Sequence, residues 1–336
     1  MPPEAKRLFK PRPLKLPLTH SAVKYGAVAA TALALAFALG VFEAGIGPRV
    51  LPQMLMVLLG SGVVALLFGL GRVTNVAFGL GGVVAYVLMQ STSVPPDDPY
   101  AAVRSPGGNL EIEQYSTANL TDADSSGFAA LDATSADIVA IQGLTPDWAA
   151  VLAERLRDEF PAQYLFPDIG LTGLGLFSRV PLGDVDTILL NGVVQVRACH
   201  TLPGTDTDVE IFAVQTLPPL SRETSLGLQA QLDQVSATLA REERPVILVG
   251  DLNAVPWSPV INRFTAQAGL RDSRRNELPS YEAGMPGLFE SPVEHIFYTE
   301  RLRCVRFETL RTASAAYLGN RASFQSADAP AEVVAL

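Results

Sequence analysis

Two short segments hold the carboxylate, amide and imidazole side chains whose spacing could support chemistry. Asp251 and Asn253 follow the apolar run 246–250, and Glu294 and His295 open a second apolar run. Carboxylates are the hard oxygen ligands that magnesium and calcium prefer, and an imidazole can exchange a proton near neutral pH. The same residues also have structural uses, because Asp and Asn close turns after buried strands by bonding backbone groups. Both interpretations remain open on these residues alone.

The sequence does not favour a zinc site, a serine-nucleophile site or a P-loop nucleotide site. The chain has three histidines, and neither His20 nor His200 belongs to a ligand pattern. Its two cysteines, Cys199 and Cys304, form no C-x-x-C motif, so a zinc site is not expected and both are predicted to be buried free thiols. A G-x-S-x-G elbow and a P-loop are also absent from the sequence.

Alternating strands and helices must position the candidate residues. Val209, Ile211 and Ala213 fall at every second position and so share one face, which indicates a strand with that face buried. Thr145 followed by Pro146 is typical of a helix start. By such signals we expect strands at 110–115, 138–142, 173–178, 193–201, 209–216, 246–250, 294–299, 302–309 and 331–335, and helices at 145–159, 224–243 and after Ser258-Pro259.

The stretch 22–89 is apolar enough to predict a membrane anchor. It divides at Gly- and Pro-containing breaks into three segments, 22–46, 51–70 and 73–89, each near the length of about 20 residues that a spanning helix needs. A cleaved signal peptide does not explain the first segment, because the run is too long and two more follow. Glu43 near the end of the first segment is either an intramembrane site or an interfacial residue whose carboxylate reaches water.

Charge asymmetry predicts the orientation of this anchor. Six basic residues precede or begin the first segment, whereas Asp97 and Asp98 follow the third. Under the positive-inside rule the N-terminus is cytoplasmic, and three spans then put residues 90–336 in the periplasm, beyond the inner membrane. If the third segment does not span, that domain lies in the cytoplasm instead. The basic residues are Lys6, Arg7, Lys10, Arg12, Lys15 and Lys24.

The predicted layout has four parts: a basic N-terminus at 1–21, the anchor at 22–89, a Pro- and Gly-marked linker at 90–108 and a domain at 109–336. Residues 90–336 contain 17 arginines, no lysine and 32 acidic residues. Nucleic-acid binding depends mainly on neutralising phosphates, so this acidic domain is not expected to have a nucleic-acid partner.

Five segments in chain order carry a resemblance to the endonuclease/exonuclease/phosphatase family, some members of which have several N-terminal membrane spans. The resemblance implies an α/β fold of four layers, in which two β-sheets pack face to face with helices outside, here preceded by a transmembrane helix bundle. The segments are Ala136–Gln142, Gly175–Leu182, Phe212–Thr216 with Pro218-Pro219, Gly250–Asn253 and Val293–Phe297.

The resemblance also shows where this chain departs from a family that hydrolyses phosphoesters with a divalent metal. The family's metal-binding Glu falls at Gly143, its first-strand Asn near Ser116 and its pre-helix His at Gln215. Its terminal Ser-Asp-His is expected near 319–326, where no Asp followed by His occurs. What remains is Asp251, Asn253 and His295, with Glu294 in place of Asp, and a remnant pocket of Gln142, Gln215 and Glu294.

These departures predict a pseudoenzyme that serves as a binding or accessory subunit of a membrane assembly, with a protein partner and no cofactor. The alternative is an active divalent-metal phosphodiesterase or phosphatase with an altered site, and only that alternative requires magnesium. A further alternative is a module that binds a phosphorylated small molecule or lipid headgroup through Asp251, Asn253 and Gln215.

Overall fold

The computed structural model describes Tyr25 and residues 50–92, 110–122, 124–170, 172–274, 292–312 and 317–327. The chain divides into two compact units, which are described separately: a helical pair within the predicted anchor and a β-rich domain.

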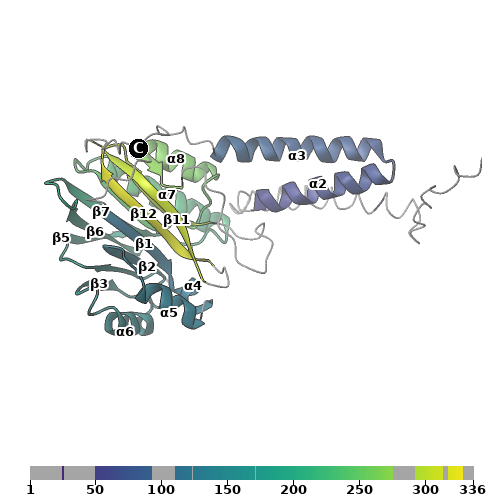
Figure 1. The fold of residues 1–336 in the computed structure, drawn as a ribbon. Helices are drawn as coiled ribbons and strands as arrows, with labels where there is room; N and C mark the ends of the chain where they lie inside the picture. The colour runs from purple at the N-terminus through teal and green to yellow at the C-terminus, as the bar shows by residue number, and fades with distance from the viewer. Residues whose placement is uncertain are drawn as a thin grey trace, which may run out of the picture. The chain divides into compact units, whose positions relative to one another are not determined.

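One six-stranded sheet, here called sheet A, contains the first strand of the domain. Its order is β11-β12-β1-β2-β4-β3 (Figure 1). β1 and β2 are parallel and the other neighbours are antiparallel, so the sheet is mixed. The strands are β1 Leu110–Ser116, β2 Ile138–Gln142, β3 Ala162–Phe166, β4 Leu174–Ser178, β11 Leu302–Arg311 and β12 Tyr317–Ser326.

A second six-stranded sheet, sheet B, has the order β5-β6-β7-β8-β10-β9. β7 and β8 are parallel, and their remaining neighbours are antiparallel. The strands are β5 Gly183–Leu190, β6 Val193–Thr201, β7 Asp208–Gln215, β8 Val246–Asp251, β9 Leu270–Asp272 and β10 Glu294–Thr299.

The two sheets pack face to face and helices cover their outer faces. Ile112 and Ile138 of sheet A share a core with Ile211 and Val249 of sheet B. On the outer side of sheet B, apolar residues of α7 and α8 pack against the sheet, and α4, α5 and α6 do the same for sheet A. The arrangement is the predicted layered α/β sandwich. The helices are α4 Thr117–Asp122, α5 Asp124–Asp132, α6 Pro146–Arg155, α7 Arg222–Leu239 and α8 Pro259–Ala268.

Local signals set the starts of the three longer helices of the domain. The side chains of Thr145, Ser221 and Ser258 accept hydrogen bonds from the exposed backbone N–H groups of α6, α7 and α8, as N-cap residues do. Pro146 and Pro259 follow at the first helical position, where no backbone donor is needed.

Several strands differ from the sequence expectation. β3, β5, β9 and β12 were not predicted, because segments such as Tyr317–Ser326 contain Gly, Asn and Ser and owe their extended form to pairing with neighbours. The strand expected at 331–335 lies outside the described residues. Cys199 and Cys304 are both buried and free, as predicted.

The helical pair consists of α2 Leu51–Leu67 and α3 Gly71–Thr92. Within the described residues, one helix is long and apolar enough to cross a membrane, over Gly71–Met89, and α2 is a shorter apolar helix. The ring of Phe78 lies over Gly62, and Gly81 meets the side chains of α2, so the two helices pack closely. The predicted first span, 22–46, lies outside the described residues except for Tyr25.

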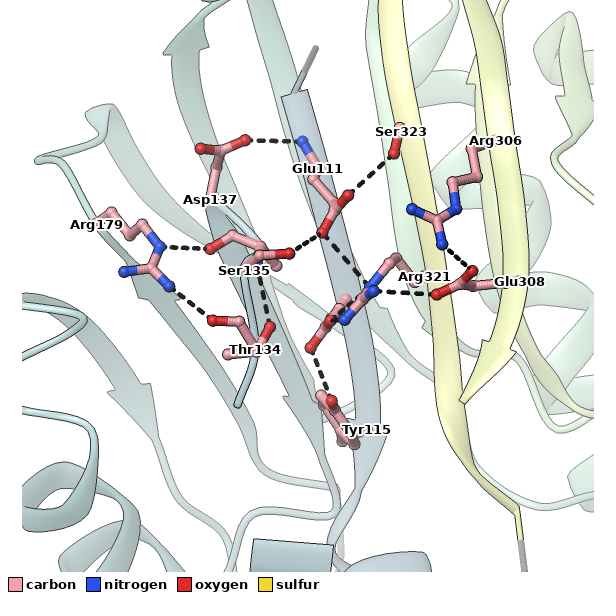
Figure 2. Close-up of polar contacts among 12 residues, drawn as sticks. Glu111, Tyr115, Thr134, Ser135, Asp137, Arg179, Arg306, Glu308, Arg321 and Ser323 are labelled. Carbon is pink, nitrogen blue, oxygen red and sulfur yellow. Dashed lines mark hydrogen bonds and ion pairs between the residues drawn. The ribbon is translucent and has the colours of Figure 1, made fainter. Parts of the chain in front are cut away.

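An ion-pair network occupies the outer face of sheet A and explains its buried charges (Figure 2). Arg321 of β12 bonds to the fully buried Glu113 of β1, with 2.6 Å from Nε to Oε1, and pairs with Glu308 of β11 at 3.0 Å. The Tyr115 hydroxyl donates to the other Glu113 oxygen at 2.7 Å. Burial, and then the charge of Glu113, raises the pKa of Tyr115, so this phenol stays a donor.

Candidate functional site

The candidate residues gather where the parallel strands of both sheets end. In sheet A, Ser116 pairs with Gln142 at the carboxyl ends of β1 and β2. In sheet B, Gln215 pairs with Asp251 at the carboxyl ends of β7 and β8. The Asn119 side chain, just after β1, donates to the Glu294 carboxylate at 3.2 Å. Asn119 lies in α4, directly after β1, and Glu294 begins β10, so this bond shows that both sets of strand ends lie at one edge of the sandwich.

Sheet B contributes a row of three side chains to this edge. Asp251 is directly opposite Gln215 on one side and Glu294 on the other. Alternate residues of a strand point to the same face, and Ala213, Val249 and Ile296, two positions away on each strand, belong to the core between the sheets. The three polar side chains of this row therefore face sheet A. Gln215 and Glu294 are buried and Asp251 is half-buried.

Sheet A contributes a facing set of amides. Gln114 of β1 is paired with Asn320 of β12, and Gln142 ends β2. Their neighbours two positions away are residues of the core between the sheets, so these amides face sheet B. All three are at most 1% exposed. Gln142 was predicted as a site residue, whereas Gln114 and Asn320 were missed because only the strand pairing brings them to this edge.

These three amides, and Gln215 of sheet B, have side-chain atoms that lack a hydrogen-bond partner. In Gln114 and Gln142 both the amide nitrogen and the oxygen are unpaired, in Gln215 the oxygen and in Asn320 the nitrogen. Buried polar atoms in native proteins are nearly always hydrogen-bonded, so such a cluster needs an explanation. It is the most unusual polar feature of the described strand ends.

Asn253 has a structural contact that aligns the loop after β8. Its side-chain amide donates to the carbonyl of Thr216 at 2.8 Å, which ties this loop to the one after β7. Its backbone N–H donates to the Asp251 carboxylate at 2.9 Å, and its φ of 50° is a left-handed conformation that Asn tolerates. Asn253 thus orients Asp251 at the edge of the sandwich.

His295 is not brought together with Asp251. It is one residue after Glu294 and points to the opposite, helix-covered face of sheet B, where its ring stacks on Phe297 at 4.9 Å between centroids. With the proton assigned to Nε2, the ring donates to the Ala254 carbonyl at 2.7 Å and accepts from Arg274 at Nδ1. Burial, followed by the charge of Arg274, lowers the pKa of His295 well below its ordinary value. These contacts match the structural alternative for this residue.

The edge carries two carboxylates, and the two arginines described on neighbouring segments, Arg274 and Arg321, contact other groups. Arg274 contacts the ring of His295 and the backbone carbonyl of Glu294. Arg321 follows Asn320 and therefore points to the outer face of sheet A, where the network of Figure 2 engages it. The local charge from Asp251 and Glu294 is negative, which disfavours a phosphate.

The residues at this edge do not fit the metal site that the resemblance implies. At the position of the expected Glu, Gly143 has a φ of 69°, a backbone conformation in which a residue with a side chain is strained. Within the described part of the chain, no group of three or more His, Cys, Asp or Glu side chains could hold a metal ion. The adjacent Asp251 and Glu294 alone are too few ligands for a magnesium or calcium site.

The terminal segment, where the resemblance implies a Ser-Asp-His, lies within one strand. Residues 319–326 lie inside β12, where Gly319 is opposite Tyr115 and Phe324 is opposite Leu110. The strand therefore runs away from the candidate edge, and only its first residues reach the end of β1. The sequence contains no Asp or His between Glu308 and Asp328, so an Asp-His pair is missing from this whole region.

Comparisons with known proteins support the fold. The profile of the Endonuclease/Exonuclease/phosphatase family matches residues 123–323, more than half of the chain. This chain belongs to that family. The search of curated proteins found no match to it.

Several solved structures share the fold of this chain at low sequence identity. The endonuclease/exonuclease/phosphatase of Beutenbergia cavernae DSM 12333 is 20% identical with a TM-score of 0.51, over 65% of this chain and 72% of the other. The one from Bacteroides vulgatus is 15% identical with a TM-score of 0.53, over 65% and 99%. The human Nocturnin catalytic domain is 14% identical with a TM-score of 0.51, over 65% and 94%.

Proposed function

We propose that this chain is a noncatalytic member of its family, anchored in the inner membrane, whose domain serves as a binding or accessory subunit of a membrane assembly. The observation that carries the proposal is the set of side chains at the shared edge of the two sheets. There Gln142 is followed by Gly143 in a left-handed conformation, Gln215 replaces a histidine, and His295 faces away. A catalytic group works as part of a constellation, and this constellation is incomplete.

The helical pair supports the anchor. Apolar side chains such as Leu67 and Val83 are 60–78% exposed within this unit, as expected of helices that face lipid. The glycines that let α2 and α3 approach are also typical of membrane helix packing. With the basic N-terminus, these features support a cytoplasmic N-terminus and a periplasmic domain, in line with the positive-inside rule.

A hydrolysis assay tests the proposed absence of catalysis. The full chain in detergent, with magnesium or manganese and bis(4-nitrophenyl) phosphate, should show no turnover that exceeds that of the Asp251→Ala variant. Asp251 is the surviving carboxylate of the Gly-Asp-Leu-Asn motif, so a real activity would depend on it. Turnover that a chelator stops and that Asp251→Ala abolishes would establish the alternative, an active phosphoesterase with an altered site.

A further inference from the structure

The unpaired amides at the shared edge of the sheets include as many hydrogen-bond donor groups as acceptor groups. We call Gln114, Gln142, Gln215 and Asn320 the amide cluster. Its unpaired groups are the NH₂ groups of Gln114, Gln142 and Asn320 and the carbonyl oxygens of Gln114, Gln142 and Gln215. The cluster thus lacks acceptors and donors in equal number.

This balance selects among the chemical classes of ligand. A phosphate offers only acceptors, and the carboxylates of Asp251 and Glu294 repel it. An ammonium group offers only donors and leaves every NH₂ group of the cluster unpaired. A hydroxyl group donates and accepts at once, and its proton can also be accepted by a carboxylate. Several hydroxyl groups on one uncharged molecule therefore match the cluster and its two acidic neighbours together.

We propose that the amide cluster, with Asp251 at its half-exposed rim, binds the hydroxyl groups of an uncharged sugar. Ser116 and Asn119 are also half-buried, so parts of this edge reach solvent beside the buried amides. Binding includes an outward turn of the rim side chains, which lets the ligand reach the buried amides. The inference rests on the proposed absence of catalysis, because a metal-bound phosphoester would occupy the same strand ends.

Two isosteric variants separate binding from folding. Gln142→Met and Gln114→Met keep the side-chain volume and remove an amide that has no partner in the ligand-free chain. Replacing an unpaired buried polar group by an apolar one of similar shape is neutral or stabilising. Both variants should therefore fold with an unchanged or raised melting temperature. Gln267→Met is the matched control, since Gln267 is exposed on α8.

Ligand-detected NMR on the full chain tests the inference. The chain is kept in a detergent with a polyoxyethylene headgroup, so that no detergent sugar competes. The probes are the methyl glycosides of glucose, mannose and galactose, with inorganic phosphate in the same sample. We expect saturation transfer to at least one glycoside in the wild type and Gln267→Met. In Gln142→Met and Gln114→Met the affinity should fall about fivefold or more, the effect of one lost hydrogen bond.

Three results would overturn the inference: no transfer to any glycoside, equal transfer in Gln142→Met, or binding of phosphate instead of the glycosides. The first result is expected if the amide cluster binds only water, or if its amides form hydrogen bonds with one another. The hydrolysis assay keeps the two proposals apart. A chain that neither binds glycosides nor hydrolyses phosphodiesters contradicts the sugar inference alone, whereas turnover contradicts the proposed function.

Discussion

Single residues at the shared edge of the sheets differ from those that the family resemblance implies. Asp251 and Glu294 still face sheet A, but the side chains around them are amides, which neither supply the missing carboxylates nor carry a positive charge. His295 keeps its place in the sequence motif and lies on the other face of sheet B. A motif match therefore establishes the backbone course and leaves the chemistry to the individual side chains.

The neutral, buried ring of His295 predicts a loss of stability in acid. Because burial and then Arg274 lower its pKa, the folded chain keeps the ring neutral, whereas the unfolded chain binds a proton below pH about 6.5. Stability is thus fully present above that pH and falls as the pH decreases, by at most about 1.4 kcal/mol per pH unit. Melting temperatures measured from neutral pH down to about pH 5 should decrease, and His295→Gln should flatten the decrease.

His200 is a second buried histidine for which we expect the same kind of acid dependence. Burial also lowers the pKa of His200, although the charge of Asp137 opposes the effect, and this residue lies outside the candidate edge. His200→Gln and His295→Gln should each remove part of the pH dependence. A His295→Gln variant with the same pH dependence as the wild type would contradict the contacts assigned to this ring.

At the scale of strands, close contact between β7 and β8 sets the position of Asp251. A Cβ on Gly250 would lie 1.9 Å from the carbonyl oxygen of Val214, so no larger residue fits between the paired strands. Gly250→Ala should destabilise the domain by about 3 kcal/mol or more, as overpacking at backbone does. Gly227→Ala in α7, where a Cβ meets nothing within 4 Å, should instead stabilise by about 0.5–1 kcal/mol. Equal melting temperatures for the two variants would contradict this reading of the strand contact.

Most of these elements could be predicted from the sequence, but only some of the residues at the shared edge of the sheets could. β2, β6 and β10 have the predicted bounds, because apolar alternation and flanking turns mark them clearly. β12 was missed, since its residues have weak strand preference and depend on pairing with β1 and β11. Because β12 was not predicted, Asn320 was not recognised as a site residue. Gln114 was predicted to lie in a strand but was not assigned to the site. A register is set by tertiary contacts, so these two amides could not be placed from local sequence.

For the whole molecule, the proposed orientation makes a direct prediction. A phosphatase reporter that works only in the periplasm should be active when fused after Tyr100 and silent when fused at the N-terminus, because the three proposed spans separate the two points. The basic residues before the first span and the apolar helices motivate this expectation. The opposite pattern would mean two spans and a cytoplasmic domain.

The apparent mass of the protein in native electrophoresis tests whether it is part of a larger membrane assembly. One span would be enough to tether a domain, yet α2 and α3 are both apolar and their glycines suit close packing. The arginine-only, acidic domain also suits ion pairing with a protein partner. In native electrophoresis from mild detergent the chain should run as a discrete band well above its own 35.8 kDa. Migration as a single chain, with no recurrent partner on crosslinking in intact cells, would contradict the assembly.

Manganese binding tests the central claim, that the edge of the sandwich has lost its metal site, most directly. Electron paramagnetic resonance of free manganese, titrated with the full chain, should show no stoichiometric binding, because Asp251 and Glu294 have no further carboxylate beside them in the described residues. Asp251→Asn should give the same curve as the wild type. A tight site filled by one manganese per chain, and lost in Asp251→Asn, would contradict the account.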